Sequence, residues 1–360
     1  MTMAEVTFVA HHPEFASIIG DSPTSKLLAE TDTTTREPLF HEACVYHAPT
    51  QSVFVTSNQL SSQDSSIHPT GKYIRLSQIH DGIPDGPSSG KARVDDVTPP
   101  SLARSMLNGG VNFTGDTLLV CAQGSTVDED HSGLIILSAK DATQDKPADL
   151  DVKPLVTSYH GNAFNSVNDV IVHPVDGSVW FTDPCYGFHQ GIRPVPQLPD
   201  QVYRFDPATG SIRAIADGFT RPNGLCFSPD LKTLYVTDTG AIHGSSAVPL
   251  NPAGPSHIHA FDIIERDQGI FLANRRLFAH APGRLPDGIK CDTRGNVYAG
   301  CMDGVEVWNK QGVLIGVIQV PGGVANFCFG EKGAMYLCNE TRFWKVQLAG
   351  LDVRGALLGI

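Results

Sequence analysis

Six segments of the chain repeat one pattern: a short apolar stretch, a polar turn, and a second short apolar stretch. Short apolar runs bounded by Gly, Pro, Asp and Ser are typical of β-hairpins. Clear examples are NDVIVHPVDGSVWFTD at 168–183, RPNGLCFSPDLKTLYVTD at 221–238 and DGIKCDTRGNVYAG at 287–300. The six units begin near residues 42, 109, 168, 223, 287 and 325. Such internal repetition constrains the fold strongly, because it indicates an array of similar units around one core.

Further candidate strands lie between the hairpins, for example at 201–216 and 305–318. Four strands per unit and six units predict an all-β fold, a six-bladed β-propeller with four-stranded blades around a central channel. We expect a single propeller domain over residues 1–360. An irregular β-sandwich is the alternative, but it would not produce the repetition. Residues 1–37 match the repeat weakly, and we expect them either to close the last blade or to lie over the pocket.

The charge balance excludes several classes of partner. The formal net charge is −12, and no basic stripe interrupts it, so neither nucleic acid nor an anionic membrane surface is an expected partner. No apolar run reaches the ~18 residues of a membrane span, and the start of the chain lacks the pattern of a secretory signal. The eight Cys form no CxxC pair. Together these features favour a cytoplasmic protein with free thiols.

One register position is shared by all six hairpins, near the start of the first strand. It holds Glu42, Gly109, Asn168, Asn223, Asp287 and Ala325. Equivalent positions in a propeller surround the channel, so the four oxygen-bearing side chains are expected to converge. Two carboxylates and two amides form a hard ligand set, which predicts one divalent cation, most often Ca²⁺, with Mg²⁺, Mn²⁺ or Zn²⁺ as alternatives. Each residue alone could also be a simple turn former.

The sequence resembles the gluconolactonase or senescence-marker family of six-bladed propellers, and more distantly the paraoxonases. It is most similar to the fungal lactonohydrolases. The stretches that carry the resemblance are PLFHEACVYHAPTQSVFV (38–55), FNSVNDVIVHPVDGSVWFTDPCYG (164–187), RPVPQLPDQVYRFDPATG (193–210), RPNGLCFSPDLKTLYVTDTG (221–240) and LPDGIKCDTRGNVYAGCMDGVEVWN (285–309). The resemblance implies a divalent ion on the family's metal-binding positions, which Glu42, Asn168, Asn223 and Asp287 match. It also implies hydrolysis of a cyclic ester, a lactone.

Lactone hydrolysis requires a polarised carbonyl, an activated water and stabilisation of the developing oxyanion. We expect Asp287 to act as general base, because it would be a metal ligand with a second carboxylate oxygen. Asn168 and Asn223 would orient the carbonyl oxygen as well as bind the ion. Substrate contacts are expected from three residues: Ser166, Tyr186 and His243. The source of the proton for the leaving alkoxide stays open.

Two Asp residues stand at matching positions in neighbouring units. Asp183 and Asp238 each follow the key Asn of their hairpin by 15 residues. Equal register predicts equal roles, either capping the turn at the strand end or supporting the metal ligands from behind. His41 precedes Glu42, and alternation along a strand would direct its ring to the other face, towards packing or a supporting hydrogen bond.

Two other functions stay open. The same metal site could hydrolyse phosphotriesters or aryl esters, or the chain could be a non-catalytic propeller with a structural Ca²⁺. Family members specialised for sugar lactones can carry Arg two residues before the middle Asn, where this chain has Ser166. With Phe164, Tyr186 and Phe188 nearby, this favours a less polar lactone. The role of the loop at 58–100 and the oligomeric state are not predicted.

Overall fold

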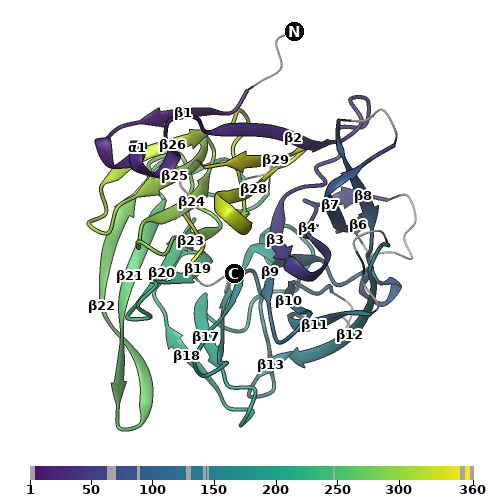
Figure 1. The fold of residues 1–360 in the computed structure, drawn as a ribbon. Coiled ribbons are helices and arrows are strands. Elements are labelled where there is room, and N and C mark those ends of the chain that lie inside the picture. Colours follow the sequence, from purple (N-terminus) through teal and green to yellow (C-terminus); the bar gives the residue numbers. More distant parts are fainter. Residues whose placement is uncertain are drawn as a thin grey trace.

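The strands of the chain surround a central channel as the blades of a propeller (Figure 1). The structure is a computed structural model that describes residues 5–62, 70–86, 90–126, 131–140, 143, 146–245, 248–348 and 353–356. Six sheets are arranged around the channel, and each contains four antiparallel strands that belong to one blade. The prediction of a six-bladed β-propeller is therefore confirmed.

The first three blades each follow the chain from the channel outwards. Their innermost strands come from the hairpins that begin near residues 42, 109 and 168. The blades are β3 (Glu42–His47), β4 (Ser52–Thr56), β7 (Leu76–Pro84) and β8 (Ala92–Asp96); β9 (Leu107–Asn112), β10 (Thr117–Ala122), β11 (Gly133–Lys140) and β12 (Asp149–Val156); and β15 (Val170–Val172), β16 (Val179–Asp183), β17 (Gln201–Phe205) and β18 (Ile212–Ala216).

The other three blades repeat this order, and the last one takes its outer strand from the N-terminal segment. They are β19 (Pro222–Phe227), β20 (Thr233–Asp238), β21 (His257–Arg266) and β22 (Gly269–His280); β23 (Ile289–Cys291), β24 (Val297–Cys301), β25 (Gly304–Trp308) and β26 (Leu314–Gln319); and β27 (Phe327–Phe329), β28 (Ala334–Asn339), β29 (Arg342–Gln347) and β2 (Thr24–Glu30).

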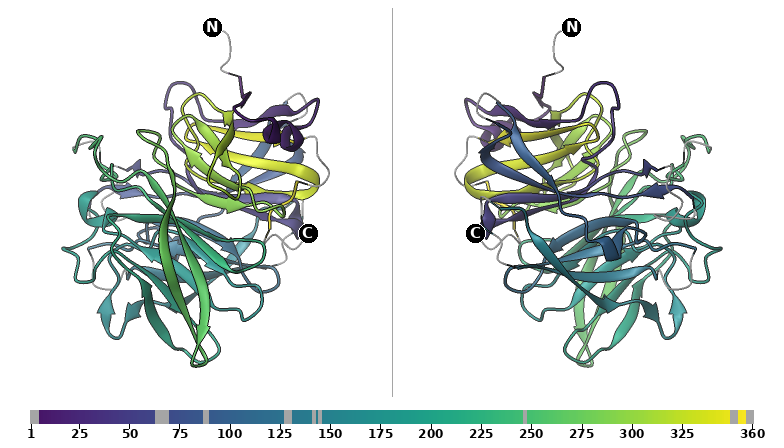
Figure 2. Two further views of the ribbon diagram at one scale, coloured as in Figure 1. Left: turned by 90° about the vertical axis from the view of Figure 1, so that its left-hand side faces the viewer. Right: turned by 90° about the vertical axis from the view of Figure 1, so that its right-hand side faces the viewer.

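The N-terminal segment closes the ring. Strand β2 pairs with β29, so the last blade combines strands from both ends of the chain (Figures 1 and 2). Strand β1 (Thr7–Ala10) adds a fifth strand to the β23–β26 blade. Between them, helix α1 (Pro13–Ile19) buries Phe15 and Ile18. The Phe15 ring lies where a side chain at Gly316 would stand, so only Gly fits beneath the helix. Of the two expectations for this segment, the structure shows blade closure.

The apolar core lies between the blades, and the channel itself is not filled by it. Trp180 of β16 is 1% exposed and packs edge-on against Phe227 of the next blade, with ring centroids 5.2 Å apart. Phe164 and Phe181 pack in the same way, at 5.3 Å. Burying each such ring contributes about 2–3 kcal/mol. Packing between neighbouring sheets thus fixes the angular position of each blade, and with it the start of each innermost strand.

Short elements complete the described chain. They are the helices α2 (Tyr186–His189), η1 (Ala48–Thr50), η2 (Pro100–Leu102) and η3 (Glu331–Gly333), and the two small hairpins β5 (Leu60–Ser61) with β6 (Lys72–Tyr73) and β13 (Ser158–Tyr159) with β14 (Asn162–Ala163). Among the described residues, none of the helices has the length and apolar character needed to span a membrane.

Candidate metal centre and its surroundings

The four predicted metal ligands all lie where an innermost strand begins. Glu42 opens β3 and Asn223 is the second residue of β19, while Asn168 and Asp287 stand two residues before β15 and β23. Glu42, Asn168 and Asn223 are buried, at 4–6% exposure, and Asp287 is half-buried. Because these strands lie side by side around the channel, the four side chains surround one end of it. The four residues thus occupy equivalent positions in their blades, as the hairpin alignment predicts.

The backbone bends away from regular pairing at two of these ligands. The β3–β4 ladder shifts register between Glu42 and Val45, and Ala43 and Cys44 adopt positive φ angles of 58° and 56°. The β19–β20 ladder shifts in the same way around Asn223. Bulges re-aim side chains, and non-glycine residues with positive φ are strained. Packing thus sustains a strained conformation that directs the Glu42 side chain.

Neighbouring blades hold the ligand residues through their backbones. Thr182 Oγ1 donates to the carbonyl of Asn223 at 2.8 Å, and Thr237 Oγ1 donates to the carbonyl of Asp287 at 2.9 Å. Close approach of the strands requires glycine beside the ligands. A Cβ at Gly109 would lie 2.6 Å from the carbonyl oxygen of Asn168. The small residue at this register position therefore serves the packing of a ligand from the next blade.

The carboxylates of the ring act on each other. Burial raises the pKa of Asp287 well above its usual range, and the charge of Glu42 raises it further. Burial also raises the pKa of Glu42. Buried Asp169, which follows Asn168, contributes negative charge to both. This end of the channel therefore concentrates negative charge that a bound cation would stabilise.

The two amides present oxygen atoms suited to a cation. Asn168 Oδ1 is buried and has no hydrogen-bond partner in the described part of the chain. Asn223 uses its nitrogen, which donates to Thr239 Oγ1 at 3.3 Å, so its Oδ1 is available on the opposite side of the amide. A buried acceptor without a donor is costly unless a ligand satisfies it. The ring thus fits a hard divalent ion in its donor atoms and in its unsatisfied acceptor.

The alignment by register did not identify Asn326. This residue follows Ala325, one of the two aligned positions that carry no side-chain oxygen. Its Nδ2 donates to Glu42 Oε2 at 2.7 Å, and its Oδ1 accepts from the backbone N–H of Phe327. Asn326 therefore fixes one oxygen of Glu42 and leaves the other for a ligand. The sequence feature that could have identified this residue is an Asn at the start of the sixth hairpin.

His41 lies beside the ring, next to a carboxylate from the last blade. Its Nδ1 is 2.6 Å from Glu340 Oε1, and Asn58 Nδ2 donates to the other Glu340 oxygen at 3.3 Å. Burial alone would lower the pKa of His41, but the charge of Glu340 and this hydrogen bond outweigh it and raise the pKa to about 10. The ring of His41 is thus a cation beside the carboxylates. Of the two expectations for His41, packing or a supporting hydrogen bond, the structure shows a hydrogen bond, to Glu340.

Asp183 and Asp238 have the equal roles that their register predicts. Asp183 accepts from the backbone N–H groups of Asn165 and Ser166 at 2.9 and 2.8 Å. Asp238 accepts in the same way from residues 220 and 221, at 3.0 and 2.8 Å. Each carboxylate therefore holds the chain two to three residues before an Asn of the ring. Burial raises the pKa of Asp183 to about 7, although both backbone donors oppose this.

Ser166 does not offer a surface to a substrate. Its side chain is fully buried; the hydroxyl donates to the Pro184 carbonyl at 2.6 Å and accepts from the Gly187 N–H at 2.9 Å. Both bonds anchor the start of helix α2. Phe164 is likewise buried, against Phe181, in the core between blades. Their sequence positions suggested that Ser166 and Phe164 line the pocket. Instead, both side chains are buried near strand ends, where they support the structure.

Tyr186, by contrast, places a hydroxyl beside the ring. The side chain is 5% exposed, and its hydroxyl is buried close to Thr239. Burial and the charge of Asp287 raise the pKa of Tyr186 well above its usual value. Gly244 permits this position, because a Cβ there would lie 3.0 Å from the Tyr186 ring. The protonated hydroxyl is thus a donor close to Asp287.

A second cluster of polar side chains lies near Tyr186, around Arg221. The guanidinium contacts His243 Nδ1 at 2.6 Å and His189 Nε2 at 3.3 Å, and donates to the Gly240 carbonyl at 3.0 Å. Arg221 lies two residues before Asn223, the same offset that Ser166 has from Asn168. His243 was expected near the pocket, but Arg221 was not singled out, although the RPNG stretch displays it.

The loop after β4 crosses this end of the channel. Asn58 contacts the last blade through Glu340, whereas Gln59 Nε2 donates to Gln190 Oε1 beside α2 at 2.8 Å. Lys72 Nζ, on β6, donates to the carbonyl of Gln190 at 3.0 Å. The small β5–β6 hairpin therefore spans from the first blade to the third. It belongs to the 58–100 loop, to which the sequence assigned no role.

The opposite end of the channel has a different character. A cavity of about 410 Å³ opens there, lined by apolar side chains such as Val45, Phe113, Phe227 and Phe329, with Lys290 among them. These residues follow the ligand positions by several residues along the same innermost strands. None of the four predicted ligands lines this cavity, and Lys290, which does line it, also acts by its charge on Glu42.

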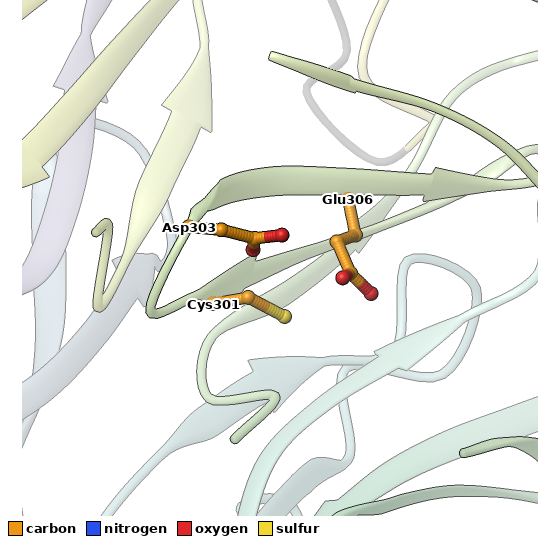
Figure 3. Close-up of side chains that lie close together, drawn as sticks. All are labelled: Cys301, Asp303 and Glu306. Carbon is orange, nitrogen blue, oxygen red and sulfur yellow. The ribbon is translucent and has the colours of Figure 1, made fainter. Parts of the chain in front are cut away.

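A further acidic cluster lies at the hairpin that joins β24 and β25. Cys301, Asp303 and Glu306 bring their donor atoms within 4.8 Å of one another (Figure 3). Arg284 forms ion pairs with both carboxylates. Glu306 is fully buried, and burial raises its pKa to about 7 while Arg284 lowers it. A protein cation thus supplies the positive charge in this cluster, and we do not assign a metal to it.

Comparison with known proteins agrees with this architecture. Residues 95–339 match the family model described as the SMP-30/Gluconolactonase/LRE-like region, so the chain belongs to this family. It is 34% identical over 187 residues to a lactonohydrolase of Aspergillus oryzae, covering 49% of this chain and 42% of the relative. It is 31% identical over 191 residues to a gluconolactonase of Zymomonas mobilis, covering 50% and 49%.

A solved structure extends the likeness to the whole fold. A gluconolactonase from Xanthomonas campestris superposes with a TM-score of 0.68 and 25% identity, covering 96% of each chain. The sequence matches to the curated relatives are shorter, and this chain spans about half the length of those relatives.

Proposed function

We propose that this protein is a metal-dependent hydrolase that opens a lactone at the oxygen ring. The observation that carries the proposal is the ring itself. Two carboxylates and two amides stand at the starts of innermost strands in four blades, and Asn168 Oδ1 is buried without a donor in the described chain. The names of the relatives, lactonohydrolase and gluconolactonase, support the same activity.

The charges around the ring also suit a dication. Four carboxylates (Glu42, Asp169, Asp287 and Glu340) and two cations (His41 and Lys290) act on one another there, which leaves a net charge of −2 when all are ionised. We propose Ca²⁺, because its preferred ligands are carboxylate and carbonyl oxygens. Glu42, Asn168, Asn223 and Asp287 would hold it. Bound there, the ion would supply Lewis acidity for a carbonyl and make water more acidic.

The side chains around the ring would divide the remaining tasks. Asp287, half-exposed at the channel end, would accept the proton of the attacking water. Asn168 and Asn223 would orient the lactone carbonyl, and Asn326 would keep Glu42 in place. The Tyr186 hydroxyl would donate to oxygen as negative charge develops on it. The β5–β6 hairpin would restrict access of bulk water.

The activity is tested by acid release in a pH-stat with aldonate, pantoyl and aromatic lactones, and with an aryl ester and a phosphotriester for comparison. We expect lactone turnover that disappears with chelator and returns with Ca²⁺. Preferential turnover of the aryl ester or the phosphotriester would transfer the proposal to that reaction class. Folded, Ca²⁺-loaded protein that hydrolyses none of these compounds would contradict an enzymatic role.

A further inference from the structure

Arg221 is a buried cation without a carboxylate of its own. Its side chain is 5% exposed, and in the described part of the chain no Asp or Glu forms an ion pair with its guanidinium. Two of the acids whose charges act in this region have other hydrogen-bond donors. Asp238 accepts from backbone N–H groups, and Asp200 accepts from the Cys185 thiol at 3.3 Å. A buried guanidinium in this situation favours an anion nearby.

The guanidinium determines which ring nitrogen of each neighbouring histidine carries the proton. Guanidinium groups donate hydrogen bonds and cannot accept them. His243 Nδ1 and His189 Nε2 must therefore be the acceptors of their contacts with Arg221. The protons then lie on His243 Nε2 and His189 Nδ1. Neither of these N–H groups has a hydrogen-bond partner in the described part of the chain.

Both histidines remain neutral beside Arg221, and each keeps one N–H group as a donor. Burial and the charge of Arg221 lower the pKa of His189, and the same two causes lower that of His243. The rings pack edge to face with centroids 4.9 Å apart, so the two donors belong to one unit. We refer to Arg221, His189 and His243 together as the donor rim.

The donor rim adjoins the oxygen ring. Arg221 stands two residues before Asn223 on the chain, and its charge acts on Tyr186, whose hydroxyl also feels the charge of Asp287. Gly244, next to His243, lies against the Tyr186 ring. A molecule whose reacting carbonyl lies at the oxygen ring would therefore extend other substituents towards the rim.

From this geometry we infer that the substrate is a lactone carrying a carboxylate, which the donor rim binds through the N–H groups of His189 and His243 with the Arg221 charge behind them. The inference rests on the proposed lactonase function and narrows its substrate class. It replaces the expectation of a less polar lactone, which was based on Ser166 and on aromatic residues that include buried Phe164. Arg221 is a positioning residue in this account, because it acts through the two histidines.

The test compares two lactones that differ only in charge. They are 5-oxotetrahydrofuran-2-carboxylate and its carboxamide, both assayed with Ca²⁺ by pH-stat. We expect KM for the carboxylate to be about 10-fold or more below that for the carboxamide, as charge-assisted hydrogen bonds imply. In Arg221→Gln this preference should fall to about 3-fold or less. The change should appear as a rise in KM for the carboxylate.

A matched control and a second variant accompany this comparison. Arg275 also contacts a histidine, with Nη2 3.2 Å from His259 Nε2, but it lies on the outer strand of the same blade. Arg275→Gln should leave the preference unchanged. His243→Phe keeps a ring at the rim, removes one donor, and should weaken the preference even if Arg221→Gln does not fold.

Binding of a non-hydrolysable pair separates this inference from the proposed function. Calorimetry would compare the lactam 5-oxopyrrolidine-2-carboxylate with its carboxamide. Tighter binding of the carboxylate, lost in Arg221→Gln and in His243→Phe, supports the donor rim even if no lactone is hydrolysed. Lactone turnover without preference for the carboxylate, or equal binding of the two lactams, overturns the inference and leaves the proposed function intact.

Discussion

Two clusters of buried carboxylates lie close together in this propeller, and they are balanced in different ways. At the β24–β25 hairpin, Glu306 and Asp303 share the guanidinium of Arg284. At the channel end, burial and the charge of Glu42 raise the pKa of Asp287, and the amide oxygen of Asn168 has no donor in the described chain. The first cluster contains its own cation, whereas the second has the ligands for one. The difference shows that proximity of acidic groups alone does not define a metal site.

The largest expected effect is on kcat, which should fall when the channel ring is altered and not when the Arg284 cluster is altered. Asp287→Asn removes the proposed base and one ligand, so kcat on the best lactone should fall by about 10³-fold. Glu306→Gln alters only the cluster that Arg284 balances, and its kcat should stay within about 3-fold of the parent. Initial rates with saturating Ca²⁺ check both. Equal losses in the two variants would erase the distinction between the clusters.

The pH dependence of the free energy of unfolding should reflect the protonation of Glu306, in the cluster that contains Arg284. Burial raises the pKa of Glu306 from 4.5 to about 7. The folded state then holds the proton more tightly than the unfolded state, so this group's contribution to stability falls as pH rises from about 4.5 to about 7 and is constant above. The loss is about 2 kcal/mol between pH 5 and 7.

Denaturant titrations of the parent and of Glu306→Gln, at several pH values, measure this slope. The variant should lose that part of the pH dependence, whatever its absolute stability. An unchanged slope in Glu306→Gln would show that the Arg284 charge already keeps Glu306 ionised, and the two clusters would then differ even more than we describe.

A smaller effect should follow from the residue that holds Glu42. Asn326→Ala removes the 2.7 Å hydrogen bond to Glu42 Oε2 and should weaken Ca²⁺ affinity about 10-fold, as loss of a group supporting a metal ligand does. Asn309 is the matched control, since its Nδ2 contacts Glu14 at 3.3 Å in another part of the protein. Asn309→Ala should leave the affinity unchanged. Competition with a fluorescent Ca²⁺ chelator measures both variants.

Much of the ring could be predicted from the sequence, because each repeated hairpin puts the same sequence position at the same place in its blade. Four of the six equivalent positions carry oxygen, and the fold places them at one end of the channel. The partners of these residues could not be predicted in the same way. Glu340 reaches His41 from the far end of the chain, and the Glu42–Asn326 bond joins the first blade to the last. No repeat encodes such closure contacts.

The rest of the site shows where local patterns mislead. Ser166 and Arg221 occupy the same offset before their Asn residues, yet one is buried support and the other a buried cation at the rim. Only their surroundings distinguish the two: Ser166 meets a backbone carbonyl, and Arg221 meets two histidine rings. The β5–β6 hairpin lies in a loop without apolar periodicity, so its course across the channel end depends on contacts with Gln190 that the sequence pattern does not reveal.

Direct measurement of Ca²⁺ binding tests the central claim, that the channel ring and not the Arg284 cluster is the metal centre. Calorimetric titration of chelator-treated protein should show one Ca²⁺ per chain. Glu42→Gln should lose that binding, and Glu306→Gln should retain it with unchanged stoichiometry. Loss of binding in Glu306→Gln with retention in Glu42→Gln would place the metal at the other cluster and contradict the account.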